Sequence, residues 1–282
     1  MTDELKKKVD QAIKLLKSAG KMAKEHGQSL EIAYSGGKDS DVILELAKMA
    51  GIEYRAIYKN TTIDPPGTIK HAIENGCEVM RPSKNFLQLI SHSGFPSRRN
   101  RFCCARLKEY KVLDYAVVGV RRDESAKRAE RYKEPETCRV YSKNVKSRQY
   151  LPILEWTVND VAEFIVERGI KVHPLYYDDE GNLHPERRLG CVGCPLAYKK
   201  HRQKEFKQYP GFVKLWLRGA RNYWDAHPNG KIRTWFDDIY QWFTMSLFCE
   251  DMAEFRTRFG KNLFDNGTDC KQFLMDYFGI DL

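Results

Sequence analysis

The chain has 282 residues, a formal net charge of +10, a pI near 9.1 and 42% hydrophobic residues. This length allows one large domain or a main domain with a smaller one, and the apolar content suffices for a sizeable core. It holds no run of eighteen apolar residues and opens with no charged and apolar leader, so we expect a cytoplasmic protein with no membrane contact.

The first twenty residues place apolar side chains at helical spacing with lysines between them, which predicts a surface helix. Four short apolar runs follow, separated by helical patterns, an order typical of βαβ units and a mostly parallel sheet. We therefore predict an α/β fold. The expected strands are residues 30–35, 53–60, 77–82 and 114–120, and the expected helices are 39–50, 66–75 and 104–112.

The second half of the chain changes character twice. Residues 121–150 are polar and basic, and a helix is expected after Trp156, with Thr157 as N-cap and Asp160 as its acidic partner. Beyond residue 198 the sequence is aromatic and helical, which predicts a helical cap on the sheet domain. The expected domain limits are 1–27 for an N-terminal helix, 28–198 for the sheet domain and 199–282 for the helical region.

The turn SGGKDS joins the first expected strand to the first helix of the sheet domain. Helix N-termini carry unpaired N–H groups and a positive dipole end, where anions bind. Gly36 and Gly37 let a phosphate approach the backbone, Ser35 and Ser40 offer hydroxyl groups, and Lys38 adds a charge. The spacing is neither that of the Walker loop nor GxGxxG. It predicts a nucleotide site, with a plain Ser–Gly turn as the alternative.

The cysteines form a second motif. Cys103 and Cys104 are adjacent, and Cys191 and Cys194 follow much later as a CxxC pair. Four thiolates match the demand of a [4Fe–4S] cluster, while structural zinc and unliganded core thiols are the alternatives. Disulfides are rare in the cytosol. The other four cysteines are expected as buried packing residues, Cys77 and Cys249, or as inert or reactive residues of loops and termini, Cys138 and Cys270.

Lysines and arginines cluster in four stretches, PSRRNRF, GVRRDESAKRAERYKE, YKKHRQKEFK and LRGARNYW. A basic protein attracts polyanions because each neutralised phosphate releases a counterion. The same stretches also fit solvated helix faces. Both interpretations, a nucleic acid partner and an ordinary surface, stay open on charge alone.

Together these motifs resemble the phosphoadenosine phosphosulfate (PAPS) reductase family of the PP-loop ATP pyrophosphatases, or adenine nucleotide alpha hydrolases, over about residues 28–200. SGGKDS matches the PP-loop at all six positions, and GVRRDESAKRA, LPILEWTVNDVAEFI, HPLY and RRLGCVGCPL also match. The paired cysteines with CxxC are similar to the cluster ligands of adenylyl-sulfate reductases and of DndC- and SspD-type phosphorothioation proteins. The resemblance implies a Rossmann-like sheet domain, ATP with Mg²⁺, and a [4Fe–4S] cluster, or Zn²⁺ in its place.

The resemblance also implies roles for individual residues. Arg121 and Arg122 would form the nucleotide loop, with a charged helix start as the alternative, and Asp39 would be a Mg²⁺ or water partner. His173 is either packed or catalytic. The implied catalytic residues are Lys38, Asp39, Arg121 and Arg122, the implied nucleotide-binding residues are Ser35, Gly36, Gly37, Lys38, Asp39, Ser40, Thr61, Thr62 and Asp64, and the implied metal ligands are Cys103, Cys104, Cys191 and Cys194.

Two departures from the reductases bear on the reaction. The C-terminal stretch GTDCKQFLMDYFGIDL lacks the Glu-Cys-Gly-Leu-His segment of the sulfonucleotide reductases, and the PP-loop is intact. Both favour an adenylating ATP pyrophosphatase in sulfur transfer, with nucleic acid as acceptor and a cysteine desulfurase or other protein as sulfur donor. The alternatives are a sulfonucleotide reductase using Cys270 or Cys138 and a DNA-binding regulator that leaves ATP uncleaved.

Overall fold

The computed structural model describes residues 1–143, 145–260 and 267–282. The chain divides into two compact units. The sheet unit comprises Met1–Asn60, Pro66–Pro82 and Lys108–Gly190, and the helical unit comprises Thr61–Pro65, Ser83–Leu107 and Cys191–Leu282. The domain limits expected at residues 27 and 198 stay a prediction. In the described part of the chain, every helix is too short or too polar to cross a bilayer.

A six-stranded sheet forms the sheet unit, in the order β3-β2-β1-β4-β6-β5. Neighbouring strands are parallel except β5 and β6, which form an antiparallel hairpin at one edge. The α/β class and the mostly parallel sheet are therefore confirmed. The strands are β1 (Leu30–Tyr34), β2 (Arg55–Lys59), β3 (Glu78–Met80), β4 (Tyr115–Val117), β5 (Glu136–Ser142) and β6 (Val145–Tyr150).

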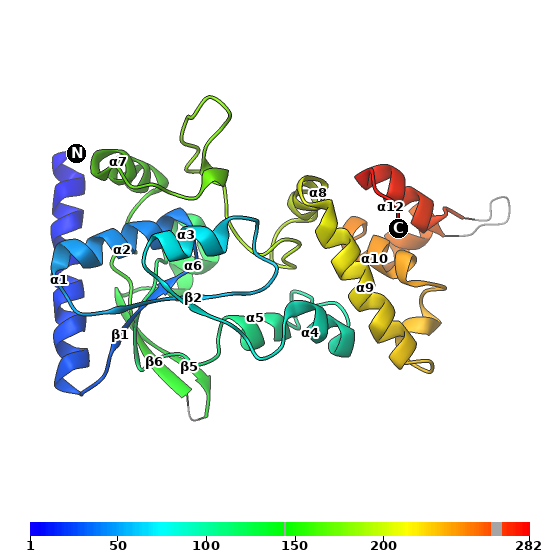
Figure 1. The fold of residues 1–282 in the computed structure, drawn as a ribbon, viewed down its shortest axis with the longest axis horizontal. Helices are drawn as coiled ribbons and strands as arrows, with labels where there is room; N and C mark the ends of the chain where they lie inside the picture. The colour runs from blue at the N-terminus through cyan, green and yellow to red at the C-terminus, as the bar shows by residue number, and fades with distance from the viewer. Residues whose placement is uncertain (144, 261–266) are drawn as a thin grey trace. The chain divides into compact units, whose positions relative to one another are not determined.

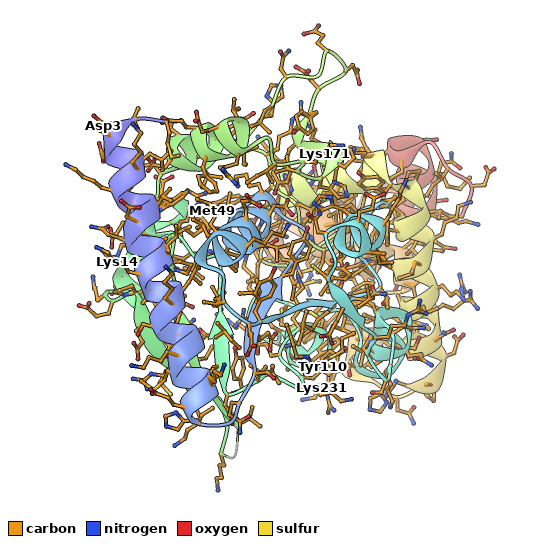
Figure 2. All side chains as sticks on the ribbon, turned by 60° about the vertical axis from the view of Figure 1, so that its left-hand side comes forward. Asp3, Lys14, Met49, Tyr110, Lys171 and Lys231 are labelled. Atoms are coloured by element: carbon orange, nitrogen blue, oxygen red, sulfur yellow. The ribbon has the colours of Figure 1, made fainter. Side chains whose placement is uncertain are left out.

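Helices surround this sheet (Figure 1). The long α1 packs against α2 and against β1, β4 and β6, and α2 also packs on β1 and α7. The buried residues of α1 recur every three or four positions, while Lys14 on its other face lies in solvent (Figure 2). The helices of this unit are α1 (Asp3–Glu25), α2 (Lys38–Ala50), α3 (Thr68–Glu74), α6 (Ala126–Arg131) and α7 (Val158–Arg168), with the 3₁₀ turns η1 (Arg122–Glu124) and η2 (Pro174–Tyr176).

The α7 helix begins as the sequence predicts. Thr157 accepts a hydrogen bond from the Asp160 amide, and Asp160 accepts one from the Thr157 amide at 2.7 Å, which completes a capping box. The basic stretch 121–150 differs from expectation, because it contains the β5–β6 hairpin. The edge strand β5 tolerates charged residues, and the inner strand β6 buries the polar Ser147 and Gln149, so neither has the apolar run that marks an inner strand in the sequence.

The helical unit has its own core of aromatic and aliphatic side chains, centred on Trp216, Phe206 and Phe243. Gly219 of α9 lets α4 approach closely, since a Cβ atom there would lie 2.2 Å from Ile90. The helices are α4 (Phe86–Ser93), α5 (Phe102–Leu107), α8 (Lys199–Gln208), α9 (Pro210–Ala226), α10 (Ile239–Phe248), α11 (Met252–Phe259) and α12 (Cys270–Phe278), with the 3₁₀ turn η3 (Lys231–Thr234).

The helical C-terminal region is thus confirmed, but its unit also takes in α4 and α5 from the middle of the chain. The helix expected at 104–112 is shorter than predicted and ends at Leu107. The chain passes from the helical unit to the sheet unit at that residue, and Lys111 adopts a left-handed φ of 46° that no helix continues through.

Candidate functional site

The PP-loop lies in the sheet unit between β1 and α2. Gly36 has a φ of +79°, and a Cβ atom there would lie 2.6 Å from the Thr68 side chain, so glycine is required on both counts. Gly37 is the N-cap of α2 and contributes no side chain. Ser40 donates a hydrogen bond from its hydroxyl to the Gly37 carbonyl at 2.6 Å, and Ser35 reaches Ser40 at 3.3 Å. The strand, the bend and the helix therefore present the positive end of α2.

Two cations meet on one carboxylate beside this helix start. Lys38 Nζ lies 3.0 Å from Asp39 Oδ2, and Arg121 Nε lies 2.7 Å from Asp39 Oδ1. Both cationic side chains are less than a tenth exposed. Arg121 reaches this position from the end of β4, where Gly119 allows the Asp39 backbone to approach. Arg121 Nη1 also lies 3.0 Å from Oδ2 of the partly exposed Asp123, so an anion would bind the two cations in exchange for a carboxylate.

Arg122 has a different place from Arg121, although the sequence pairs them. Its guanidinium group donates to the backbone carbonyls of Tyr132 and Lys133 and forms an ion pair with Glu155. These contacts stabilise the segment after η1. Of the four residues predicted as catalytic, the structure therefore brings together Lys38, Asp39 and Arg121.

Tyr176 is a residue of this site whose role the sequence did not predict, although it lies in the matching stretch HPLY. Its hydroxyl oxygen would lie 3.3 Å from a Cβ atom at Gly37, and its ring lies 5.5 Å below Lys38 Nζ. Burial raises the pKa of Tyr176, and the amides of Lys38 and Leu189 partly offset this rise. The neutral Tyr176 hydroxyl lies close to Gly37 at the start of α2, so a phosphate bound there must form a hydrogen bond with this hydroxyl or displace it.

A buried polar network supports the loop from below. The Asp41 carboxylate accepts a hydrogen bond from Tyr34 and lies 3.0 Å from His71 Nε2. Burial raises the pKa of Asp41. His173 lies edge-on to His71 at 5.7 Å, and burial lowers the pKa of His173 to about 4, so this ring is neutral at pH 7. The network ties β1, α2, α3 and η2 together under the bend.

The four predicted sulfur ligands lie in the helical unit. Cys103 is buried on α5, and its thiol interacts with that of Cys104 and with the more distant sulfurs of Cys191 and Cys194. These neighbours and burial raise the pKa of Cys103 strongly, with the hydrogen bond to Cys104 as the largest cause. None of the eight cysteines, all of them within the described residues, forms a disulfide. The structure therefore gathers the vicinal pair and the CxxC pair in one unit.

The side chains of Arg202 and Glu205 in α8 form hydrogen bonds with the backbone of Gly193, in the middle of the CxxC turn. Gly193 has a φ of +75°, and a Cβ atom there would lie 2.3 Å from the buried Phe206 ring. The Gly193 amide donates to Glu205 Oε2 at 3.0 Å, and its carbonyl accepts from Arg202 Nε at 3.1 Å. Arg202 is 6% exposed, although the sequence places it in a basic stretch. Its pKa, which burial lowers to about 10, leaves it charged at pH 7.

The residues Thr61, Thr62 and Asp64 belong to this second site. The Cys191 thiol lies 3.5 Å from Thr61 Oγ1 and 3.6 Å from Asp64 Oδ1. Thr62 has a left-handed φ of 64°, a strained conformation for a β-branched residue, and its hydroxyl accepts a hydrogen bond from the Phe86 amide at the start of α4. The predicted contact of the three residues with the nucleotide stays a prediction, and the contact of Thr61 and Asp64 with Cys191 is a finding.

The donor set fits a [4Fe–4S] cluster in its chemistry. The four thiols come from two segments of the helical unit, and the buried Arg202 near Cys194 can offset the negative charge of bound thiolates. Among the described residues, no three His, Cys, Asp or Glu side chains already surround a common point that would hold a metal ion. The thiols at present bond to each other, to Thr61 and to Asp64. Ligation would replace these hydrogen bonds.

The remaining cysteines have other surroundings. Cys77, Cys249 and Cys270 are buried, and burial raises the pKa of Cys77 to about 12 and that of Cys270 to about 11. Cys138 is exposed on β5. At neutral pH the Cys270 thiol therefore stays protonated, which makes it a poor nucleophile.

Comparisons with known proteins agree with the motifs. Residues 29–197 match the phosphoadenosine phosphosulfate reductase domain family. An uncharacterized protein of Methanocaldococcus jannaschii is 27% identical over 230 residues, which cover 76% of this chain and 53% of that protein. The sulfate adenylyltransferase subunit 2 of Aeromonas hydrophila is 28% identical over 179 residues, which cover 51% of this chain and 59% of the relative. The chain spans about half the length of the curated relatives it matches.

Solved structures show weaker likeness. The PAPS reductase of Candida auris in its phosphate complex is 15% identical, with a TM-score of 0.43 over 68% of this chain and 96% of that one. The U34-tRNA thiolase NcsA of Methanococcus maripaludis with its [4Fe–4S] cluster is 14% identical, with a TM-score of 0.38 over 79% and 80%. The sequence match over residues 29–197 identifies this chain as a member of the phosphoadenosine phosphosulfate reductase domain family.

Proposed function

We propose that this protein is an ATP pyrophosphatase that adenylates an oxygen atom of a nucleic acid in a sulfur-transfer reaction similar to DNA phosphorothioation. The observation that carries the proposal is the convergence of Lys38, Asp39 and Arg121 at the start of α2, behind the glycines of the bend. Cations and backbone amides at a helix start stabilise the charge of a leaving diphosphate, and catalysis of this kind rests on positioning and electrostatics.

The first step of the proposed reaction forms one bond to the α-phosphorus of ATP and breaks another. An oxygen of the acceptor attacks the α-phosphorus of ATP, the bond to the β-phosphate oxygen breaks, and pyrophosphate leaves with the electron pair. Lys38 and Arg121, which both contact Asp39, would neutralise this charge, and Asp39 would hold Mg²⁺ or the attacking group. The terminal sulfur of a persulfide on a donor protein, such as a cysteine desulfurase, then bonds to the acceptor and displaces AMP. A dithiol reductant supplies the two electrons that cleave the remaining S–S bond, which leaves the sulfur on the acceptor and restores the donor thiol. The AMP leaves with the electron pair of the broken bond.

The cysteine site would act in the sulfur-transfer step of this proposal. Cys103, Cys104, Cys191 and Cys194 would hold a [4Fe–4S] cluster, which can supply electrons or an iron atom that binds sulfur. Arg202 and Glu205 fix the CxxC turn, and Thr61 and Asp64 orient the Cys191 thiol in the absence of iron. Zinc is the alternative metal, and iron and sulfide analysis of anaerobically purified protein distinguishes the two.

The structure favours cleavage of ATP over reduction of a sulfonucleotide. Such a reduction needs a thiolate nucleophile, and Cys270 is buried with a pKa raised to about 11. Cys138 lies on the exposed edge hairpin. Formation of sulfite from adenylyl sulfate or PAPS with a thiol donor would support the reductase instead.

The test is pyrophosphate release from ATP, with and without added nucleic acid. We expect Lys38→Ala to reduce release at least about 100-fold, because it removes a cation from the leaving group. Lys48→Ala is the matched control, since Lys48 lies exposed in the last turn of the same helix. Undiminished release by Lys38→Ala would remove the PP-loop from the mechanism. ATP that binds but stays intact in the wild type would favour a regulatory protein.

A further inference from the structure

We propose that the surface beside the four cysteines binds single-stranded nucleic acid, with Tyr198 as a stacking platform for one base and the arginines of residues 98–106 on the phosphates. The proposal rests on the proposed function, because it gives the acceptor a place on the chain. We call this surface the arginine platform, and it consists of Arg98, Arg99, Arg101, Arg106, Tyr198 and Lys200.

The charge of the chain is concentrated in the unit that carries the cysteines. The helical unit holds 19 lysines and arginines against 12 acidic residues, a net formal charge of +7, whereas the sheet unit holds 29 against 26. Residues 83–107 contain five of these cations and no acidic residue. All five are exposed, and none pairs with a carboxylate among the residues that the structure describes. Such a surface attracts the phosphates of a polyanion.

Arg98 ties this basic segment to the CxxC loop. Its Nε donates to the Pro195 carbonyl at 3.2 Å, and its guanidinium also reaches the Ala197 carbonyl at 3.4 Å. The same guanidinium lies 5.8 Å from the centre of the Tyr198 ring. The arginine segment, the aromatic ring and the cysteine pair at 191–194 are therefore held together within one unit.

Tyr198 has the exposure that a stacking platform needs. It is 80% exposed, next to Leu196 at 40%, and together they place apolar surface in water beside a cationic group. As the N-cap of α8 it makes no side-chain hydrogen bond to the helix within the described structure, so capping does not explain a tyrosine there. Aromatic rings flanked by arginine stack on unpaired bases of any sequence.

The start of α8 adds a further positive feature. Its first turn holds Lys199 and Lys200 and no acidic residue in the described structure. Cations at the positive end of a helix dipole weaken the helix, so this placement runs against the usual preference. A bound phosphate would relieve that repulsion. Lys199 donates to the Cys249 carbonyl and Lys200 is exposed, so Lys200 is the cation of this turn that a phosphate can reach, beside the neighbouring arginines.

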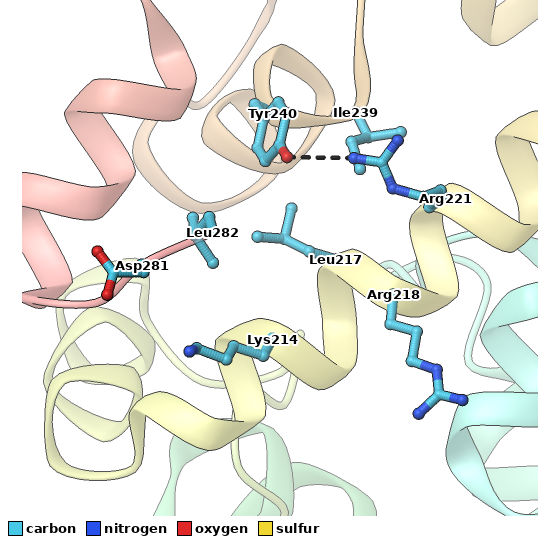
Figure 3. A pocket seen from close by; sticks show the side chains of 8 residues that line it. All are labelled: Lys214, Leu217, Arg218, Arg221, Ile239, Tyr240, Asp281 and Leu282. Atoms are coloured by element: carbon cyan, nitrogen blue, oxygen red, sulfur yellow. Dashed lines mark hydrogen bonds between the residues drawn. The ribbon is translucent and has the colours of Figure 1, made fainter.

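A second basic surface of the same unit provides the comparison. The groove in Figure 3 is lined by Lys214, Arg218 and Arg221 of α9 together with Tyr240. Its tyrosine is partly buried, unlike the exposed Tyr198, and Arg221 donates to the Tyr240 hydroxyl at 3.1 Å. The Asp281 carboxylate also lines this groove. It offers charge without a free aromatic face and serves as the matched control.

The test measures binding of fluorescently labelled oligodeoxyuridylate, oligouridylate and a DNA duplex to the anaerobically purified protein by anisotropy. We expect Tyr198→Ala to weaken binding of single strands about 10- to 100-fold and Tyr198→Trp to retain it. Arg99→Ala with Arg101→Ala should lower the salt slope by roughly 1.4, since each phosphate contact to a single strand contributes about 0.7. The control Lys214→Ala with Arg218→Ala should lose less than about threefold.

Binding of either single strand above the duplex supports the proposal, and the tighter strand identifies the sugar. Wild-type affinity in Tyr198→Ala, equal binding of duplex, or an equal loss in the α9 control would overturn it. Failure of the proposed function is separate, because ATP cleavage without nucleic acid depends on Lys38 and not on Tyr198. Iron content and the thermal unfolding midpoint of each variant show that the cysteine site and the fold are intact.

Discussion

In the sheet unit, Lys38 and Arg121 both donate hydrogen bonds to the carboxylate of Asp39. In the helical unit, by contrast, the charged groups of Arg202 and Glu205 bind the backbone carbonyl and amide of Gly193. The first arrangement pairs the charges of the site with each other. The second uses charged side chains to shape the backbone and leaves the thiols to one another and to Thr61 and Asp64.

Because of this difference, the two sites would bind their ligands in different ways. An anion that enters the PP-loop must displace a carboxylate from two cations, so ligand binding there exchanges one set of charge contacts for another. A cluster bound to the cysteines would leave the contacts of Arg202 and Glu205 with Gly193 in place. We therefore propose that ligand binding depends on electrostatics at the PP-loop and on backbone geometry at the cysteine site.

The strongest test of the backbone argument is Gly193→Ala. The added methyl group would lie 2.3 Å from the Phe206 ring, and the φ of +75° is unfavourable for alanine. We expect unfolding to become easier by roughly 3 kcal/mol, from strain in the backbone and overpacking in the core. Urea denaturation measures the loss, and hydrogen exchange should place it in α8 and α9. The iron content of anaerobically purified protein should fall as well.

Gly51→Ala is the control for this variant. Gly51 ends α2 with a φ of +64°, but a Cβ atom there would have no neighbour within 4 Å among the described residues. Its cost should be about 1 kcal/mol, from backbone conformation alone, with no change in iron content. Equal losses from the two variants would show that contact with Phe206 does not hold the CxxC turn.

The parts of the fold that were predicted correctly share a local cause. Strands β1 to β4 follow apolar runs between turns, and α7 begins at a capping box whose two residues are three apart in sequence. The hairpin β5–β6 was missed because the edge strand β5 carries little apolar periodicity and the inner strand β6 buries the polar Ser147 and Gln149. Its Val140 is 61% exposed, so the pattern that marks a buried strand is absent there.

The site shows the same limit at longer range. The SGGKDS turn pointed to Lys38 and the family resemblance to Arg121, but their meeting on Asp39 joins positions 82 residues apart. The burial of Arg202 depends on the carbonyls of Gly193 and Ser246, the second of which lies 44 residues away. Thr61 and Asp64 contact Cys191 across about 130 residues. Such pairings arise from tertiary structure, and no local pattern encodes them.

Acid should weaken the sheet unit before the helical unit. The folded-state pKa of His173 is about 4, below its ordinary value of 6.5, so the unfolded chain binds more protons between these values. Stability is therefore complete above pH 6.5 and falls as the pH drops toward 4, by about 2 kcal/mol between pH 6.5 and 5. His173→Gln should flatten this dependence. Urea denaturation at pH 7 and pH 5 measures it.

His92→Gln is the control, because His92 is exposed in the last turn of α4 in the helical unit. This variant should keep the pH dependence of the wild type. The His71–Asp41 pair is present in all three proteins, so the difference between them isolates His173. An unchanged slope in His173→Gln would show that the ring accepts a proton in the folded protein without loss of stability.

The smallest expected effect tests the pairing of charges at the PP-loop directly. Asp39→Asn keeps the shape of the side chain but removes the charge that holds Lys38 and Arg121. We expect pyrophosphate without magnesium to bind roughly tenfold more tightly, because the anion no longer competes with a carboxylate. The magnesium dependence of ATP cleavage should weaken at the same time. Isothermal titration with pyrophosphate and a magnesium titration of the cleavage rate measure the two changes.

Asp123→Asn separates this local competition from a general change of charge. Asp123 accepts a hydrogen bond from Arg121 Nη1 at 3.0 Å, but it is 41% exposed and also binds the Val158 amide. Water already screens that pair, so its removal should change pyrophosphate affinity less than about twofold. If both variants bind pyrophosphate with wild-type affinity, Asp39 does not restrain the two cations. The PP-loop would then no longer differ from the CxxC turn in having its cations restrained by a carboxylate.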